Sequence, residues 1–267
     1  MSNDPNSESS DPLALTIERG LATIELSRPP ANALGSALIT AMSEALDEIE
    51  RAGARAVVIR SAVPTYFAAG ADLKLLSTLE RGQFGRYLTD LRQVIERVAT
   101  LAPPTVAAID GYALGGGLEL AMACTMRIAS SASRLGVPEV KLGLLPGAGG
   151  TQRLPRLIGR GPALDLLLTG RSVDAAEAER IGLVDLVVES GDIVTESERI
   201  GQAFVDGPAA ALSAIVRCVD AARDLPLAAG MEVEAEAVLD LFETSDAVEG
   251  ISAFLGKRAP DFSQRHH

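Results

Sequence analysis

The stretch from Thr105 to Gly150 constrains the fold and the chemistry of this chain more than any other part of the sequence. It opens with an apolar, β-branched run over residues 105–109, which is typical of a buried strand, and a turn follows. Three consecutive glycines, 115–117, then lead into an almost wholly apolar helical pattern over 118–123. Glycine lets a backbone come close to a ligand, and a helix that begins there presents unpaired N–H groups and its positive dipole end. This stretch therefore predicts a backbone site for developing negative charge.

Two carboxylates accompany this predicted site. Glu119 is the single charged residue of the helical pattern, and Glu139 follows Pro138 ahead of a second glycine-rich loop at 146–150. Carboxylates beside a backbone site for negative charge indicate acid/base chemistry on a substrate that develops such charge. The residues alone leave a plainer interpretation open, in which Glu119 is a first-turn carboxylate favoured by the helix dipole and Glu139 is a solvent-exposed residue after proline.

The composition excludes several classes of protein. A net charge of −12 and a pI of about 4.7 oppose a general surface for nucleic acid or for anionic membranes. No apolar run approaches the roughly 18 residues of a membrane span. Hydrophobic residues make up 47% of the chain and aromatic residues only 3%, so we expect an aliphatic core with much helix.

Histidine and cysteine usage argues against metal and thiol chemistry. His266 and His267 are the only histidines and end the chain, so we expect neither histidine catalysis nor a metal site. Cys124 and Cys218 are too far apart for a CxxC motif, which predicts buried free thiols.

The two ends of the chain are predicted to be tails. Residues 1–11 are rich in Ser, Asn, Asp and Glu and lack the basic or Arg-rich bias of a targeting segment, so we expect a disordered tail on a cytoplasmic protein. Residues 263–267 are expected to form a second tail.

The remaining pattern predicts an α/β fold. Short β-like runs at 13–17 and 21–26 flank Arg19-Gly20, a hairpin signal, and strand and helix patterns then alternate as far as residue 129. This alternation predicts βαβ crossovers around a mostly parallel sheet. The helices expected in this part are 36–51 and 84–101, and the helices expected after Gly150 are 162–169, 174–181, 193–204, 208–222, 227–242 and 247–254.

Small residues also occupy the segment from Tyr66 to Leu73. They permit close approach of the backbone to something bound, although a tight connection between a strand and a helix would need the same residues.

Four motifs in this order and spacing resemble those of the enoyl-CoA hydratase/isomerase (crotonase) superfamily. They are Phe67-Ala68-Ala69-Gly70-Ala71-Asp72-Leu73-Lys74, Gly111-Tyr112-Ala113-Leu114-Gly115-Gly116-Gly117-Leu118-Glu119-Leu120, Pro138-Glu139 with Leu142-Gly143, and Pro146-Gly147-Ala148-Gly149-Gly150-Thr151-Gln152-Arg153-Leu154. The resemblance covers nearly the whole chain, from about Leu13 to Phe262.

The resemblance implies a crotonase-like fold. A ββα spiral core is expected over residues 12–206 and a helical C-terminal region over 207–262, which serves trimerisation or acts as a lid. Trimers in this superfamily commonly pair as hexamers, so a homotrimer or a dimer of trimers is expected.

The resemblance also assigns roles to residues. The backbone N–H groups of Ala69 and Gly116 would form an oxyanion hole for the thioester carbonyl of an acyl-CoA. Glu119 would activate water for attack at C3, and Glu139 would supply the proton at C2. The residues expected to bind substrate are Ala31, Ala33, Ala69, Gly70, Ala71, Asp72, Leu73, Gly116 and Pro138.

Coenzyme A is part of this substrate, so no separate cofactor is expected. The turn at 30–34 and residues 71–73 would lie against its adenine and ribose. Arg28 and Lys74 are candidates for its phosphates, or they are solvated surface charges.

Three residues depart from the pattern of the superfamily. Thr125 stands where an Asp is usual, and Leu135 and Val137 flank Gly136 where Phe and a polar or larger residue are common. Since both of the latter precede Glu139, they affect the predicted room for the acyl chain or the placement of that glutamate.

Three functions remain open from the sequence. A trans-2-enoyl-CoA hydratase fits both glutamates. A Δ3,Δ2-enoyl-CoA isomerase or another acyl-CoA enzyme of the superfamily generally needs one base, and a non-catalytic CoA- or RNA-binding role is opposed by the acidity of the chain. The sequence does not reveal the acyl chain length or the pathway.

Overall fold

The computed structural model describes residues 11–262, so the predicted tails lie outside it except for Asp11. The chain begins with a hairpin in which β1 (Leu13–Glu18) pairs antiparallel with β2 (Leu21–Leu26). Arg19 and Gly20 connect the two strands with φ angles of 50° and 89°. The predicted hairpin is confirmed.

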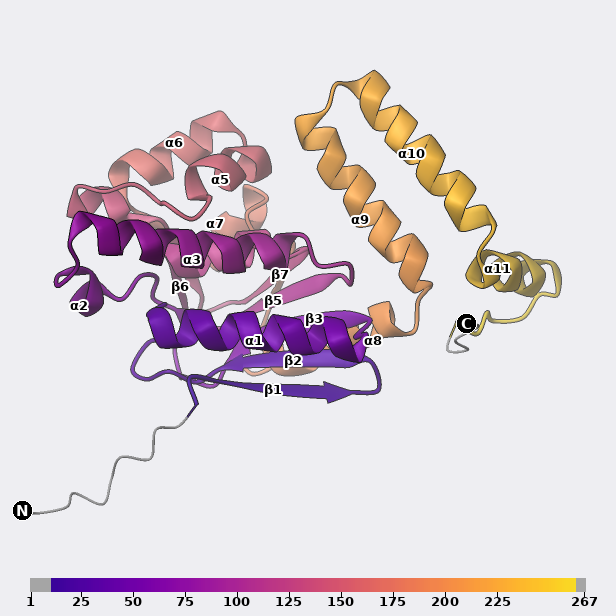
Figure 1. The fold of residues 1–267 in the computed structure, drawn as a ribbon, viewed down its shortest axis with the longest axis horizontal. Helices are drawn as coiled ribbons and strands as arrows, with labels where there is room; N and C mark the ends of the chain where they lie inside the picture. Colours follow the sequence, from indigo (N-terminus) through magenta and orange to yellow (C-terminus); the bar gives the residue numbers. More distant parts are fainter. Residues whose placement is uncertain (1–10, 263–267) are drawn as a thin grey trace, which may run out of the picture.

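A six-stranded sheet forms the centre of the described chain (Figure 1). Its order is β1-β2-β3-β5-β7-β10, and every pair after the hairpin is parallel, which confirms the mostly parallel sheet. The added strands are β3 (Ala56–Ser61), β5 (Thr105–Ile109), β7 (Met126–Ser130) and β10 (Leu186–Val188).

Helices cover both faces of this sheet. One face packs on α1 (Ser36–Ala52) and α3 (Arg81–Ala99), and the other packs on α8 (Ile193–Val205). The burial pattern of β3 explains both contacts, because Val57 and Ile59 join the core under α1 while Val58 joins the core under α8. Strands buried on both faces are expected in a parallel sheet.

A second, smaller sheet positions the candidate site. Its order is β4-β6-β8-β9, formed by β4 (Tyr66–Ala68), β6 (Tyr112–Leu114), β8 (Arg134–Gly136) and β9 (Ser172–Asp174). The first three of these strands follow β3, β5 and β7 along the chain and pair in parallel with one another. Each turn of the spiral therefore adds one strand to each sheet. The carboxyl ends of β4, β6 and β8 meet at one edge because the strands are parallel.

Short helices follow three of these strands. The helix α4 (Gly116–Ala123) comes after β6, and the 3₁₀ helix η1 (Pro138–Leu142) comes after β8. The single-turn helix α2 (Leu73–Leu76) comes shortly after β4. The later helices of the core are α5 (Gly150–Ile158), α6 (Arg160–Thr169) and α7 (Ala175–Arg180).

The sequence prediction missed α5, β10 and the strands β6, β8 and β9 of the second sheet. Pro155 lies inside α5, and glycines occur at both of its ends, which lowers the helix propensity of the segment. The helix is held by its buried side chains Leu154 and Ile158. The missed strands have only three residues each, which is too short for a periodic pattern.

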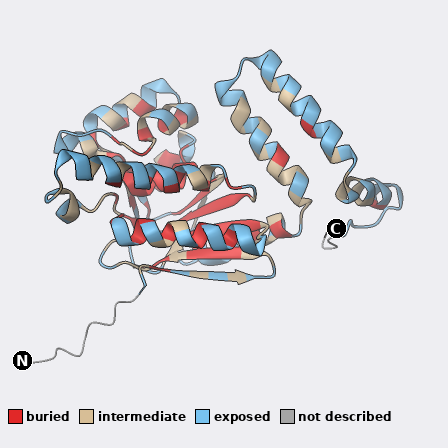
Figure 2. Cartoon of the chain, in the orientation of Figure 1, coloured by how far each residue is buried: buried red, intermediate tan, exposed pale blue. Residues whose placement is uncertain are grey.

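The C-terminal helices extend away from the core (Figure 1). They are α9 (Ala209–Asp224), α10 (Leu227–Phe242) and α11 (Ser245–Leu255), and their surfaces are mostly exposed (Figure 2). In each of these helices one residue is buried, and that residue is an alanine. Large apolar side chains remain exposed on them, including Leu227, Met231, Leu239, Phe242, Phe254 and Leu255. None of the helices in residues 11–262 is long and apolar enough to cross a membrane.

Substitution of Gly117 tests the close packing between α4 and β4. A Cβ atom at this position would lie 2.2 Å from the Ala68 carbonyl oxygen, so the two elements would have to separate. We expect Gly117→Ala to lower the free energy of unfolding by about 1–3 kcal/mol in urea denaturation. Gly85→Ala is the matched control, since that helical glycine has open space around it and should become neutral or more stable by up to ~1 kcal/mol. Equal stability of the two variants would contradict the packing.

Candidate active site

The ends of three parallel strands bring the predicted site residues together. The chain leaves β4 into residues 69–72, leaves β6 into Gly115 and α4, and leaves β8 into η1. A Cβ atom on Gly116 would lie 3.7 Å from the Gly70 Cα atom and 3.8 Å from the Ala71 nitrogen. The glycines therefore allow two backbones to approach closely at this edge.

Gly116 is available as a backbone donor at this edge. It is the first residue of α4, and the first N–H groups of a helix have no acceptor within the helix. The dipole of α4 adds partial positive charge at the same point. Gly116 can therefore stabilise a nearby oxyanion, which is the role that the sequence analysis assigns to it.

Ala69 is not available in the same way. Its N–H donates to the Ala31 carbonyl oxygen at 2.9 Å, so the prediction that Ala69 supplies the second oxyanion donor is corrected. Ala71 is the better candidate, because the carbonyl of the Gly70–Ala71 peptide group accepts the Leu34 N–H at 2.7 Å. In a trans peptide group the N–H points opposite to the carbonyl, so the Ala71 N–H faces away from Leu34. The sequence could not separate Ala69 from Ala71, since both are small residues in one motif.

Glu119 lies in the first turn of α4 and is 2% exposed. One of its carboxylate oxygens, Oε1, accepts the N–H of Ala148 at 2.8 Å and the N–H of Gly150 at 2.7 Å. Burial raises the pKa of Glu119, and these two N–H groups oppose that rise. The second glycine-rich loop therefore fixes the orientation of this carboxylate.

Glu139 lies in the first turn of η1 and is held differently. Its Oε2 atom is buried and has no hydrogen-bond partner among the described residues. A Cβ atom on Gly115 would lie 2.5 Å from Glu139 Oε1, so a glycine there leaves room for this carboxyl group. Burial raises the pKa of Glu139 to about 7, and the nearby charge of Glu119 also raises it. One carboxyl is thus anchored while the other has an oxygen free to exchange a proton.

The remaining predicted substrate residues lie on two adjoining loops. Ala31 and Ala33 belong to the turn after β2, and this turn is hydrogen-bonded to residues 69–70. Leu73 begins α2 and is 53% exposed, and Pro138 begins η1. The buried Asn32 side chain donates to the Phe67 carbonyl oxygen at 3.0 Å, which joins the turn to β4.

Asp72 and Arg28 have structural contacts at these loops. Asp72 caps α2 by accepting the N–H groups of Lys74 and Leu75. Its other oxygen forms an ion pair with Arg28 at 2.6 Å, and this contact lowers the pKa of Asp72. Arg28 is therefore engaged within the protein, which leaves the exposed Lys74 as the remaining candidate for a coenzyme A phosphate.

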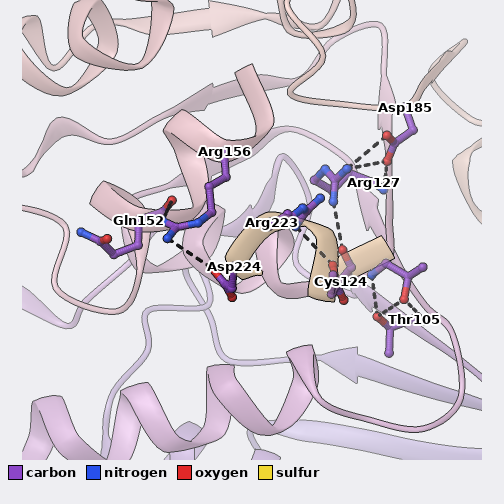
Figure 3. Close-up of polar contacts among 10 residues, drawn as sticks. Thr105, Cys124, Arg127, Gln152, Arg156, Asp185, Arg223 and Asp224 are labelled. Atoms are coloured by element: carbon purple, nitrogen blue, oxygen red, sulfur yellow. Dashed lines mark hydrogen bonds and ion pairs between the residues drawn. The ribbon is translucent and has the colours of Figure 1, made fainter. Parts of the chain in front are cut away.

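The departures from the superfamily pattern lie in the packing around the site. Thr125 exchanges hydrogen bonds with Thr105, from backbone N–H to side-chain oxygen in both directions, at 2.8 and 3.1 Å. Figure 3 shows Thr105 beside Cys124 and Arg127 at the end of α4. Leu135 and Val137 are fully buried in the main core. Cys124 is a buried free thiol as predicted, whereas Cys218 is only half-buried.

An apolar groove of about 550 Å³ adjoins η1 and the second glycine-rich loop. The sequence analysis missed it, although the Leu144-Leu145 pair in a loop was a signal of an exposed apolar surface. Leu145 is 65% exposed, and Leu168 at the end of α6 is 70% exposed. The groove is lined by Val140, Leu144, Leu145, Pro146, Thr151, Pro155, Arg160, Ala163, Leu164, Leu167 and Leu168.

Known proteins resemble this chain over most of its length. A family model described as enoyl-CoA hydratase/isomerase matches residues 16–265. The chain is 40% identical over 249 residues to a probable enoyl-CoA hydratase of Mycobacterium tuberculosis, which covers 93% of this chain and 96% of the relative. It is 38% identical over 245 residues to the probable mitochondrial enoyl-CoA hydratase 2 of Arabidopsis thaliana, covering 91% of this chain and 81% of the relative.

A solved structure also resembles this chain. The enoyl-CoA hydratase from Bacillus anthracis matches with a TM-score of 0.91 and 35% identity, covering 95% of this chain and 100% of that chain. The spiral of paired strands is thus a crotonase fold, as predicted from the motifs. The chain belongs to the enoyl-CoA hydratase/isomerase family.

The raised pKa of Glu139 predicts a dependence of stability on pH. Its folded-state pKa of about 7 lies above the ordinary glutamate value of 4.5, so its contribution to stability is present at low pH and is lost as the pH rises through about 7. We expect Glu139→Gln, which cannot ionise, to become more stable than wild type as the pH rises from 5 to 8 in urea denaturation.

Glu249→Gln is the control for this pH dependence. Arg258 lowers the pKa of Glu249 to about 2, so this group does not titrate between pH 5 and 8. The difference between Glu249→Gln and wild type should stay constant over that range. The same flat result for Glu139→Gln would show that the Glu139 pKa is not raised.

Proposed function

We propose that this protein is an enoyl-CoA hydratase, which adds water across the 2,3 double bond of a trans-2-enoyl-CoA to give a 3-hydroxyacyl-CoA. The observation that carries the proposal is the pair of carboxyl groups, the buried and anchored Glu119 and the partly buried Glu139 with its unpartnered Oε2 atom, beside two backbone donors. The activity named for the relatives from Mycobacterium tuberculosis and Arabidopsis thaliana agrees with this reaction.

The reaction needs an oxyanion site, a base and an acid. The N–H groups of Ala71 and Gly116 would bind the thioester oxygen, on which negative charge develops when water adds to C3. The anchored Glu119 would orient and deprotonate the water molecule. Glu139, with a pKa of about 7, would be protonated often enough near neutral pH to supply the proton at C2. The two transfers can also occur in one concerted step.

The alternatives need fewer of these features. A Δ3,Δ2-enoyl-CoA isomerase needs the oxyanion site and generally one base, so the second buried carboxyl group favours hydration. A non-catalytic RNA-binding role is opposed by the net charge of −12. The reaction requires no metal or redox cofactor, because coenzyme A arrives as part of the substrate.

The apolar groove beside η1 is a candidate for the acyl chain. Val140 of its lining follows Glu139 in the sequence, and Pro146 belongs both to its lining and to the loop that anchors Glu119. The acyl-CoA substrate class itself follows from the family.

Assembly into a homotrimer or a dimer of trimers would cover the exposed C-terminal helices. A groove of about 780 Å³ separates α9 from α3, α5 and the end of α4, and the contact between Arg156 and Asp224 at 3.4 Å spans it (Figure 3). Arginines outnumber acidic residues in the lining of this groove, which includes Arg92 and Arg217 but also Glu96, Asp220 and Asp224, whereas α10 carries Glu232, Glu234 and Glu236. Charge complementarity therefore favours contact between copies in this region.

A cytoplasmic location remains a proposal. The Arabidopsis thaliana relative, in contrast, is named as mitochondrial. Localisation of the full chain in its own cells, by fluorescence microscopy, would decide it.

Hydration of crotonyl-CoA and of a longer 2-enoyl-CoA, followed by loss of the conjugated-thioester absorbance, tests the function. We expect a 3-hydroxyacyl-CoA product. Glu119→Gln and Glu139→Gln should each lose at least about 100-fold in kcat while still binding acyl-CoA, because each loses a proton-transfer group. Near-wild-type turnover by either variant would reject the two-carboxylate mechanism. Isomerised product without hydration would support the isomerase instead.

The proposed assembly predicts the effect of a charge on α10. Leu239 is 70% exposed, and Leu239→Glu should reduce the molar mass measured by light scattering from that of a trimer or hexamer, because the interface would have to bury a charge. Val194→Glu is the matched control, because Val194 is an apolar residue of α8 that is 41% exposed, and this variant should keep the assembly. A monomeric wild-type protein at micromolar concentration would reject the proposed assembly.

A further inference from the structure

Arg28 connects the turn after β2 to the loop after β4. Its Nη1 atom donates to the Ala33 carbonyl oxygen at 2.6 Å, and its Nη2 atom donates to Asp72 Oδ2 at 2.6 Å. The side chain of Arg28 is 33% exposed and that of Asp72 is 15% exposed, so the contact is partly shielded from solvent. The guanidinium group is therefore held between two loops of the candidate active site.

Two peptide groups lead from this guanidinium group to the proposed oxyanion donor. The Ala33 carbonyl and the Leu34 N–H belong to one peptide group, and the Leu34 N–H donates to the Gly70 carbonyl at 2.7 Å. The Gly70 carbonyl and the Ala71 N–H belong to the next peptide group. Since each group is planar and trans, it accepts a hydrogen bond on one side and donates on the other. The hydrogen bonds thus run in one direction from Arg28 to Ala71.

We propose that Arg28 is a positioning residue that strengthens the Ala71 N–H as an oxyanion donor through this chain of hydrogen bonds; this inference rests on the proposed function. A positive charge at the start of the chain polarises the Ala33 carbonyl, which makes the Leu34 N–H a stronger donor. The same effect then passes through the Gly70 carbonyl to Ala71, because hydrogen bonds in a chain strengthen one another. The charge of Arg28 thereby reaches the thioester oxygen without touching it.

Other contacts hold the same turn without carrying charge. The Tyr87 hydroxyl donates to the Leu34 carbonyl oxygen at 2.8 Å. The Asn32 side chain accepts the Arg28 N–H at 2.8 Å and donates to the Phe67 carbonyl. None of these contacts uses the side chain of Arg28, so they support the shape of the turn independently of its charge.

The test compares Arg28→Met and Arg28→Lys with wild type in two measurements. Crotonyl-CoA hydration gives kcat and KM. Difference infrared spectroscopy gives the carbonyl stretch of bound butyryl-CoA that carries ¹³C at its thioester carbonyl, a saturated ester that cannot be hydrated. Arg60→Met is the matched control, since Arg60 is a partly buried arginine that pairs with Glu25 and Glu198 elsewhere.

We expect Arg28→Met to lower kcat roughly 10-fold with little change in KM, less than the 100-fold or more that follows from deletion of a donor. The carbonyl stretch of bound butyryl-CoA should move to higher wavenumber than in wild type, because the carbonyl is less polarised. Arg28→Lys keeps the positive charge but cannot donate to Ala33 and Asp72 with the planar geometry of a guanidinium group. Its kcat and its carbonyl stretch should therefore lie between those of wild type and Arg28→Met. Arg60→Met should leave the stretch unchanged.

A carbonyl stretch that Arg28→Met leaves at the wild-type position would overturn the proposal, even if kcat falls. Arg28 would then only support the loop. The infrared comparison does not depend on turnover. If wild-type protein polarises bound butyryl-CoA but does not hydrate crotonyl-CoA, the hydratase function is rejected, whereas the proposed role of Arg28 is not.

Discussion

Parallel pairing of three very short strands holds the candidate site together. β4, β6 and β8 have three residues each, and their pairing brings the segments after them to one edge of the small sheet. Those segments supply Ala71, Gly116 with Glu119, and Glu139. Isolated strands of this length would not be stable, so the large sheet and its helices must support them. The spiral order of the chain gives this support, since each short strand follows a strand of the large sheet.

The two glutamates differ because of their surroundings and not because of their chemistry. Glu119 accepts two backbone N–H groups from the second glycine-rich loop, which fix its carboxylate and oppose the effect of burial on its pKa. Glu139 has a buried oxygen without such a donor, and its pKa is raised to about 7. Two identical side chains are thereby prepared for different steps. A buried polar atom without a partner costs stability, and such costs are typical of functional sites.

Much of this arrangement could be predicted from the sequence. The hairpin, the parallel sheet, the start of α4 and both glutamates carry strong local patterns, because glycines, alternation and apolar periodicity each reflect one physical requirement. The choice between Ala69 and Ala71 could not be predicted, since it depends on which N–H is already bonded to the turn at Ala31. The engagement of Arg28 with Asp72 joins residues far apart in the sequence, and no local pattern reveals it. The short strands β9 and β10 are likewise defined by their partners and not by their own residues.

The C-terminal helices have a consequence for how the protein behaves at low concentration. In the single chain α9, α10 and α11 each bury one alanine, so they gain little free energy from packing on their own core. Helices of this kind owe most of their stability to tertiary contacts. If those contacts come from other copies, the folding of these three helices depends on the protein concentration. Dilution would then melt the last three helices while the sheets stay intact, so that a newly made chain completes its fold only after it meets its neighbours.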